Sequence, residues 1–181
     1  MAKKIVKKGM KKGFFEVKAP LTSTKIQLYA YNPEELVGKT VKLDLTKSLR
    51  GKNLVLVMRI KNNEGVLEAV PEKAELAMSY MKKAVRTGID YAEDSFEVEC
   101  RDAVLRVKPF LITRRRVSRG ILNLLRDSAK KTTEAYIKTR DSMEVFSDVI
   151  ANKLQKQLAQ KLKKIYPLAM CEIRVVEVVK K

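Results

Sequence analysis

The sequence predicts an α+β fold with a mostly antiparallel, barrel-like sheet in the N-terminal half, a β-hairpin, three or four helices and a C-terminal strand. Short apolar segments separated by turn residues fill the first half of the chain, and apolar residues at helical spacing dominate the region after Ser118. A β-branched segment then closes the chain. Because strands and helices do not alternate regularly, these observations favour an α+β fold over a parallel α/β sheet.

Four short strands are expected in the first half, over residues 14–17, 25–30, 40–45 and 54–60. In the third of them, Val41, Leu43 and Leu45 alternate with polar residues, as is typical of a half-buried strand. Turn residues separate the four segments, among them Asn32-Pro33, Gly38, Arg50-Gly51 and Asn62-Asn63-Glu64-Gly65.

A helix is predicted between Pro71 and Gly88. Proline is favoured at the first position of a helix, and glycine is common just after the last one. Six apolar residues recur at helical spacing between them: Ala74, Ala77, Met78, Met81, Ala84 and Val85.

A β-hairpin is expected next, with strands over residues 95–99 and 103–113 and a turn at Arg101-Asp102. A helix is expected from Ser118 to about Arg140. The pattern Asp141-Ser-Met-Glu144 is a capping box, so a further helix is expected to start there.

Asn152 leaves two alternatives open, because it either caps a separate helix or lies within one long helix. Pro167 ends this helical region. The β-branched residues that follow predict a last strand over residues 171–179.

The charge balance is strongly basic, since 39 Lys and Arg residues oppose 21 Asp and Glu residues and leave a net charge of +18. Self-repulsion on this scale favours a polyanionic partner. The alternative is a set of lysine-rich solvated faces, but solubility alone requires a much smaller net charge. We therefore expect a nucleic-acid-binding protein.

The side chains needed for common enzyme chemistry are few. The chain has no His, which excludes Ser-His-Asp and Cys-His nucleophile systems and the commonest zinc sites. Cys100 and Cys171 form no CxxC pair and are interpreted as reduced core thiols. The carboxylates Asp90, Glu93 and Asp94 are interpreted as a solvated acidic loop. We expect no enzymatic activity, no cofactor and no metal site.

The basic N-terminal segment lacks the apolar stretch of a secretory signal, and no uncharged segment is long enough to span a membrane. We therefore expect a soluble, intracellular protein. Residues 1–13 contain six lysines and no acid, so we expect a mobile basic arm there and a single α+β RNA-binding domain over residues 14–181.

The remaining charge is segregated along the chain. Residues 64–99 contain nine acids and four bases, 4 − 9 = −5, which leaves the rest at +23. We expect this acidic segment to face solvent or a basic protein neighbour. A second basic segment spans residues 101–119, and a third contains Lys153, Lys156, Lys161, Lys163 and Lys164.

The motif Lys12-Gly-Phe-Phe15 is similar to the start of the aromatic strand in RNA-recognition motifs, but the later Gly and aromatic residue are absent. We favour Phe14 and Phe15 as a hydrophobic anchor for the basic arm. Base stacking by either ring is the alternative.

Four segments, in this order, carry a family resemblance: Phe15-Glu-Val-Lys-Ala-Pro20, Gly38-Lys-Thr-Val-Lys-Leu-Asp-Leu45, Thr113-Arg-Arg-Arg116 and Ile165-Tyr-Pro-Leu168. With them the chain resembles the S3Ae family of archaeal and eukaryotic small-subunit ribosomal proteins, and it looks like a compact archaeal-type member.

The resemblance implies a structural constituent of the small ribosomal subunit, on the platform near the mRNA exit and the 3′ end of the small-subunit rRNA. Its implied partners are that rRNA and neighbouring ribosomal proteins, with mRNA and initiation factors as further candidates. The implied location is cytoplasmic and ribosome-bound.

Residues expected to contact RNA are chosen from charge and position. Guanidinium groups hold phosphates bidentately or stack on bases, and lysines act as point charges. The set is Lys3, Lys4, Lys7, Lys8, Lys11, Lys12, Lys18, Arg50, Arg114, Arg115, Arg116, Arg119, Lys130 and Lys131. A free-standing RNA- or DNA-binding regulator and an RNA-processing enzyme are the alternatives from other functional classes.

Overall fold

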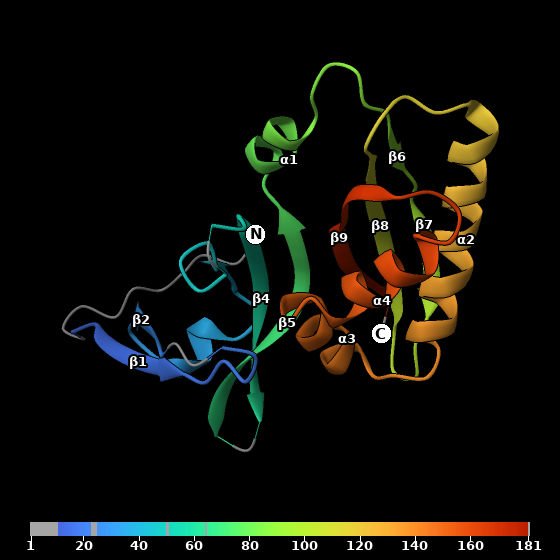
Figure 1. The fold of residues 1–181 in the computed structure, drawn as a ribbon. Coiled ribbons are helices and arrows are strands. Elements are labelled where there is room, and N and C mark those ends of the chain that lie inside the picture. The colour runs from blue at the N-terminus through green and yellow to red at the C-terminus, as the bar shows by residue number, and fades with distance from the viewer. Residues whose placement is uncertain (1–10, 23–24, 50, 64, 181) are drawn as a thin grey trace, which may run out of the picture. The chain divides into compact units, whose positions relative to one another are not determined.

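The computed structural model describes residues 11–22, 25–49, 51–63 and 65–180 (Figure 1). Its strands are β1 (Gly13–Val17), β2 (Ile26–Ala30), β3 (Thr40–Asp44), β4 (Leu54–Asn63), β5 (Val66–Leu76), β6 (Tyr91–Glu93), β7 (Phe96–Glu99), β8 (Val104–Thr113) and β9 (Leu168–Lys180). Its α-helices are α1 (Met78–Ala84), α2 (Arg119–Ile137), α3 (Ser142–Ile150) and α4 (Lys153–Leu162), and a short 3-10 helix, η1, spans Pro33–Leu36.

The described strands form two sheets. β1 and β2 make a two-stranded antiparallel hairpin, and seven strands form a second sheet with the order β3-β4-β5-β9-β8-β6, where β7 also pairs with β8. β9 runs antiparallel to both of its neighbours, β5 and β8. The α+β prediction is therefore confirmed, whereas closure of the N-terminal strands into a barrel stays a prediction.

The chain divides into two compact units. Unit 1 comprises residues 1–41 and 58–70, and unit 2 comprises residues 42–57 and 71–181. In unit 1, the inner residues of the β1–β2 hairpin, such as Val17 and Ile26, are buried. In unit 2, α2 and α4 pack on the sheet through Leu125, Ala129 and Leu162, which contact Leu111 of β8. The expectation of one domain from residue 14 onward stays a prediction.

Most predicted elements are confirmed. The first four strands, the β7–β8 hairpin, the helix after Ser118 and the C-terminal strand all form. The Ser118 side chain caps α2 by accepting a hydrogen bond from the backbone N–H of Ile121 at 3.5 Å. Pro109 lies within β8, where an irregular register between Lys108 and Pro109 accommodates the missing N–H group.

The helix predicted from Pro71 to Gly88 is wrong over most of its length. Pro71 lies buried inside β5, and only the seven residues of α1 are helical. The buried residues Leu67, Ala69 and Pro71 follow a period of two, and Glu75 pairs with Val175 of β9. Pairing with β9 thus overrides the helix propensity of the alanine and glutamate residues.

The start of α3 also differs from the prediction. Asp141 occupies the N-cap position, but its side chain makes no capping hydrogen bond. The carboxylate of Asp102, in the β7–β8 turn, instead accepts hydrogen bonds from the backbone N–H of Ser142 at 2.7 Å and from its hydroxyl at 2.5 Å. A residue from the neighbouring hairpin therefore replaces the local capping box.

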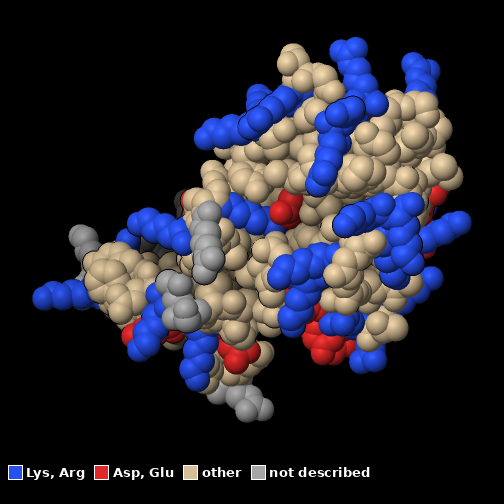
Figure 2. Space-filling view, viewed as in Figure 1, with Lys and Arg blue, Asp and Glu red and all other residues tan. Residues whose placement is uncertain are grey.

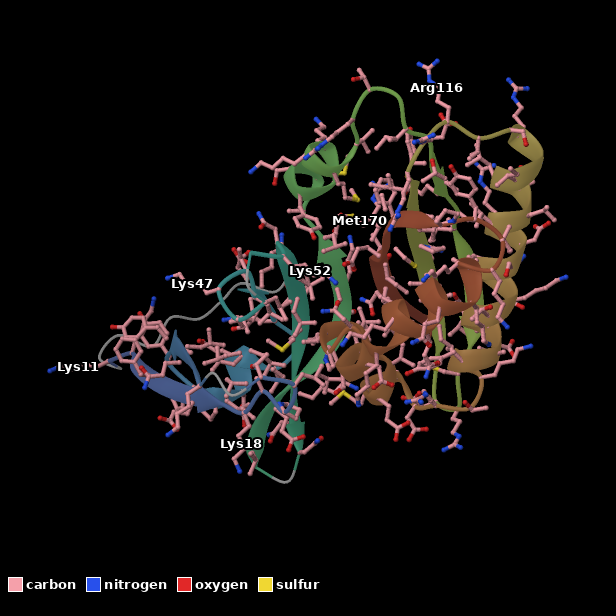
Figure 3. The ribbon with its side chains drawn as sticks, in the orientation of Figure 1. Lys11, Lys18, Lys47, Lys52, Arg116 and Met170 are labelled. Atoms are coloured by element: carbon pink, nitrogen blue, oxygen red, sulfur yellow. The ribbon has the colours of Figure 1, made fainter. Side chains whose placement is uncertain are left out.

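Asn152 separates two helices. It adopts a left-handed backbone conformation, with φ of 59°, between the end of α3 and the start of α4. Its side-chain oxygen accepts a hydrogen bond at 2.6 Å from the buried Lys52, which is labelled in Figure 3, and Lys52 also pairs with Glu172 at 2.6 Å. The alternative with one long helix is therefore excluded.

The two cysteines are unpaired and partly buried. Cys171 packs against the core cluster around Leu111 and Leu125, as expected, whereas Cys100 lies at the β7–β8 turn outside the core clusters. Burial and the neighbouring Glu172 raise the pKa of Cys171 to about 12. Because the thiolate is the reactive form, this raised pKa lowers the reactivity of Cys171 at neutral pH.

Candidate nucleic-acid interface

The three consecutive arginines lie in a short loop between β8 and α2, and internal hydrogen bonds hold this loop. Thr113, which is fully buried, has its hydroxyl 2.8 Å from the carbonyl oxygen of Asp90 and 2.7 Å from that of Arg115, and it accepts a hydrogen bond from the Asp90 N–H. The Asp90 carboxylate accepts a hydrogen bond from the backbone N–H of Val117 at 2.8 Å. The loop backbone is therefore fixed at both ends.

The side chains of this loop point outward. Arg114, Arg115, Arg116 and Arg119 are all exposed, and Figure 3 shows Arg116 projecting away from the ribbon. None of the four arginines forms an ion pair with a carboxylate among the residues that the structure describes. A fixed backbone with unpaired guanidinium groups is suited to binding phosphate.

Helix α1 adds positive charge to the same end of unit 2. Its apolar side packs through Met81 and Ala84 against Phe110 and Ile112, near the end of β8. This packing leaves Lys82 and Lys83 exposed at the end of unit 2 where β8 leads into the arginine loop. Arg86, just after the helix, is exposed as well. These bases were not predicted as RNA contacts from the sequence, because they lie within a net acidic segment. Burial of Met81 against β8 is the feature that identifies the side of α1 on which they are exposed.

The turn between α4 and β9 adds further lysines. Leu162 and Tyr166 pack in the same cluster as Ile121 and Leu122, which belong to the first turn of α2. The exposed Lys163 and Lys164 therefore lie near the start of α2. We define the basic rim as Lys82, Lys83, Arg86, Arg114, Arg115, Arg116, Arg119, Lys163 and Lys164, and Figure 2 shows basic side chains gathered over this end of unit 2.

Several other cations of unit 2 are neutralised by internal ion pairs. Arg106 pairs with Glu97 at 2.8 Å, and Lys73 pairs with Glu75 at 2.6 Å. Further ion pairs are Lys52–Glu172, Arg140–Asp148, Lys153–Asp148 and Arg174–Glu93. The basic rim differs from these positions because its bases face solvent without a described carboxylate partner.

These pairs also correct the interpretation of the carboxylates at residues 90–94 as a solvated loop. Asp90 is half-buried and fixes the arginine loop, and Glu93 pairs with Arg174. Asp94 accepts a hydrogen bond from the Ser95 N–H at 2.8 Å. Much of the acidic segment is therefore structural.

Unit 1 carries the predicted contacts Lys11, Lys12 and Lys18, all of them exposed. The Lys12 ammonium lies 5.5 Å from the ring centroid of Tyr29 and 5.0 Å from that of Tyr31. The backbone of Lys18 is tied to β5 by hydrogen bonds with Leu67 and Ala69. Phe14 is 73% exposed, so its ring is not a buried anchor.

The structure does not bring all predicted contacts together. Lys130 and Lys131 are exposed along α2, and the Lys130 ammonium lies 5.9 Å from the Phe96 ring centroid. Lys3, Lys4, Lys7, Lys8 and Arg50 lie outside the described residues.

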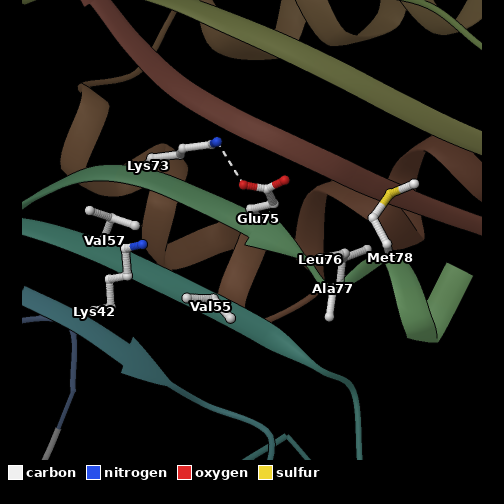
Figure 4. Close-up of a pocket in the computed structure, with 8 residues that line it drawn as sticks. All are labelled: Lys42, Val55, Val57, Lys73, Glu75, Leu76, Ala77 and Met78. Atoms are coloured by element: carbon white, nitrogen blue, oxygen red, sulfur yellow. Dashed lines mark ion pairs between the residues drawn. The ribbon is translucent and has the colours of Figure 1, made fainter.

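A pocket of about 370 Å³ is formed by described residues of unit 2 (Figure 4). Its walls are mainly apolar, and its polar groups are Lys42 and the Lys73–Glu75 ion pair.

Within the described chain, no cluster of three or more Cys, Asp or Glu side chains is placed to hold a metal ion. No helix among these residues is long and apolar enough to cross a membrane.

Comparison with known proteins relates the chain to ribosomal proteins. It is 28% identical over 172 residues to the small ribosomal subunit protein eS1 of Nanoarchaeum equitans, covering 91% of this chain and 87% of that relative. It is also 28% identical over 159 residues to the protein of the same name from Pyrobaculum arsenaticum, covering 83% and 71% of the two chains. The model of the ribosomal S3Ae family matches residues 1–181. The chain therefore belongs to the ribosomal S3Ae family.

Proposed function

We propose that this protein is a structural constituent of the small ribosomal subunit that binds rRNA on the platform, near the mRNA exit, through its basic rim. Membership of the S3Ae family supports a structural role in the ribosome, with rRNA and other ribosomal proteins as partners, and the family is not one of enzymes. The observation that carries the RNA contact is the internally fixed arginine loop with its outward guanidinium groups.

The charge arrangement supports phosphate binding by this surface. Each phosphate that a Lys or Arg neutralises releases condensed counterions, so affinity grows with the number of unpaired bases presented together. The nine bases of the basic rim come from three separate segments that pack at one end of unit 2. Each guanidinium group of Arg114, Arg115 and Arg116 can hold a phosphate through two hydrogen bonds. The fixed loop backbone positions these groups at the surface.

The remaining predicted contacts are part of the same proposal. Residues 1–13 would act as a basic arm that orders on rRNA, with Lys3, Lys4, Lys7, Lys8, Lys11 and Lys12 as point charges. Lys18, Arg50, Lys130 and Lys131 would contribute further phosphate contacts. The family resemblance supports the placement on the platform and the contacts with mRNA and initiation factors. The charge pattern supports the division into a basic arm and one RNA-binding domain.

The test compares two charge variants that lose the same net charge. One replaces Arg114, Arg115 and Arg116 by Ala; the control replaces Arg101, Lys138 and Lys156, which are exposed outside the basic rim, by Ala. Binding to purified small-subunit rRNA is measured as a function of KCl concentration. The rim variant is expected to lower the slope of log affinity against log salt by about 2 to 3, and the control by less than about 1.

Equal slopes for the two variants would contradict the proposal, because the charge would then act without regard to its position. A third variant, in which the three arginines become lysines, separates charge from geometry. It should keep most of the salt dependence and lose affinity where contacts are bidentate.

A further inference from the structure

An exposed aromatic pair lies on the outer face of the β1–β2 hairpin. Phe14 and Tyr29 are directly opposite in the antiparallel register, with ring centroids 5.0 Å apart and an angle of 46° between the ring planes. Phe14 is 73% exposed and Tyr29 is 55% exposed. Two adjacent large rings this open to solvent form an exposed apolar patch of the kind found at interaction sites.

Alternation along the hairpin separates this surface from the core. Phe15 and Leu28 form the next cross-strand pair and are half-buried, and Val17 and Ile26 beyond them are buried. Phe14 and Tyr29 therefore lie outside the core, and their contribution to the stability of unit 1 is limited to their mutual cross-strand contact. A solvent-exposed aromatic pair on the outer face is therefore available to bind a partner.

Cations flank the aromatic pair. The Lys12 ammonium lies between the rings of Tyr29 and Tyr31, 5.5 Å and 5.0 Å from their centroids. Lys11 is exposed, and Figure 3 shows it projecting from this hairpin. Aromatic faces beside unpaired ammonium groups offer both a stacking surface for a base and a counter-charge for its phosphate.

We propose that Phe14 and Tyr29 form a stacking platform for an unpaired base of single-stranded RNA, with Lys11 and Lys12 contacting the adjacent phosphates. The next cross-strand pair on the same face, Glu16 and Gln27, supplies hydrogen-bonding groups at the edge of the platform. The charge favours RNA over a protein partner, because a neighbouring basic ribosomal protein would be repelled by the lysines. This inference rests on the proposed function, since it assigns the unpaired part of the bound RNA.

The test uses the full chain and two RNA probes. One is a single-stranded RNA of about 12 nucleotides with 2-aminopurine at one position, whose fluorescence falls on stacking; the other is a fully paired RNA hairpin of similar length. Phe14→Leu removes the aromatic face but keeps an apolar side chain. The control is Leu124→Ala, which removes a 58% exposed apolar side chain of α2 outside the platform. Because Phe14 is largely exposed, the melting temperature of Phe14→Leu should stay close to that of the unmodified protein.

We expect Phe14→Leu to weaken binding of the single strand roughly tenfold and to abolish most of the 2-aminopurine quenching. Binding of the paired hairpin should be unchanged, and Leu124→Ala should behave as the unmodified protein. Irradiation of a uridine-containing single strand should also cross-link at Phe14 or Tyr29.

Unchanged single-strand affinity and quenching in Phe14→Leu would overturn the stacking platform. If the arginine-loop variant still weakens rRNA binding in that case, the proposed function stands without the platform. The Phe14→Leu protein could also be missing from small ribosomal subunits while its affinity for the single-stranded RNA is unchanged. That result would assign the surface to a protein neighbour and would also overturn the proposal. If only the arginine-loop variant is without effect, the platform stands and the rim assignment fails.

Discussion

The carboxylate of Asp90 accepts a hydrogen bond from the backbone N–H of Val117 at 2.8 Å, although the two residues are 27 positions apart. This bond joins the segment before β6 to the end of the arginine loop. An acidic residue thus fixes a basic surface through the backbone, without neutralising the guanidinium groups beside it.

Asp90→Ala should therefore loosen the arginine loop. We expect a loss of about 1 to 2 kcal/mol in the free energy of unfolding, because the Val117 N–H loses its partner in a half-buried position. Urea unfolding measures this loss. Asp90→Asn keeps an oxygen acceptor and should retain most of the stability. A larger loss of unfolding free energy in Asp90→Asn than in Asp90→Ala would contradict the assigned hydrogen bond.

Thr113→Val should destabilise the same loop from its other end. The substitution keeps the shape of a fully buried side chain but removes the hydroxyl near the carbonyl oxygens of Asp90 and Arg115. We expect a cost of about 1 to 3 kcal/mol, measured by urea unfolding, since the Asp90 N–H also loses its acceptor. Unchanged stability would show that the hydroxyl does not hold the loop.

The buried ion pair between Lys52 and Glu172 gives a prediction on stability. The side chain of Lys52 is 8% exposed and that of Glu172 is 16% exposed, so removing one charge leaves the other buried. Glu172→Gln should cost about 3 kcal/mol in unfolding free energy. Replacing both residues, by Lys52→Met and Glu172→Leu, should recover most of the loss. A double variant as unstable as Glu172→Gln would argue against an uncompensated charge as the cause.

Asp102 should make stability depend on acidic pH. Burial raises its pKa, but hydrogen bonds from Ser142 and Cys100 outweigh this effect and hold the pKa of Asp102 below its ordinary value of 3.8. A carboxyl with a lowered folded-state pKa contributes stability above its unfolded-state pKa and loses it as the pH falls through the folded-state value.

Asp102→Asn should accordingly be less stable than the unmodified protein at pH near 7, and the difference should shrink as the pH falls below about 4. Urea unfolding of both proteins across this range measures the difference directly. A difference that grows on acidification would have the wrong sign for the assigned cap.

Local patterns predicted much of the fold. The alternation of Val41, Leu43 and Leu45 correctly indicated a strand, and Ser118 correctly marked the start of α2. The region around Pro71 was mispredicted because its alanine and acidic residues favour a helix in isolation, whereas pairing with β9 depends on residues about a hundred positions later.

The candidate site was only partly predictable for the same reason. A run such as Arg114-Arg115-Arg116 is visible in the sequence, but its fixation by Asp90 is not. Lys82 and Lys163 join the basic rim only through packing of Met81 and Leu162 on distant residues. The cap of Ser142 by Asp102 likewise joins residues 40 positions apart.

The most direct test of the central claim is the stoichiometry of this chain in small ribosomal subunits. A lysate of the cells that produce it is separated on a sucrose gradient at physiological salt, and mass spectrometry compares this chain with other small-subunit proteins. The proposed function predicts one copy per small subunit, retained through a moderate salt wash. Recovery mainly at the top of the gradient would contradict it and favour a free-standing RNA-binding regulator.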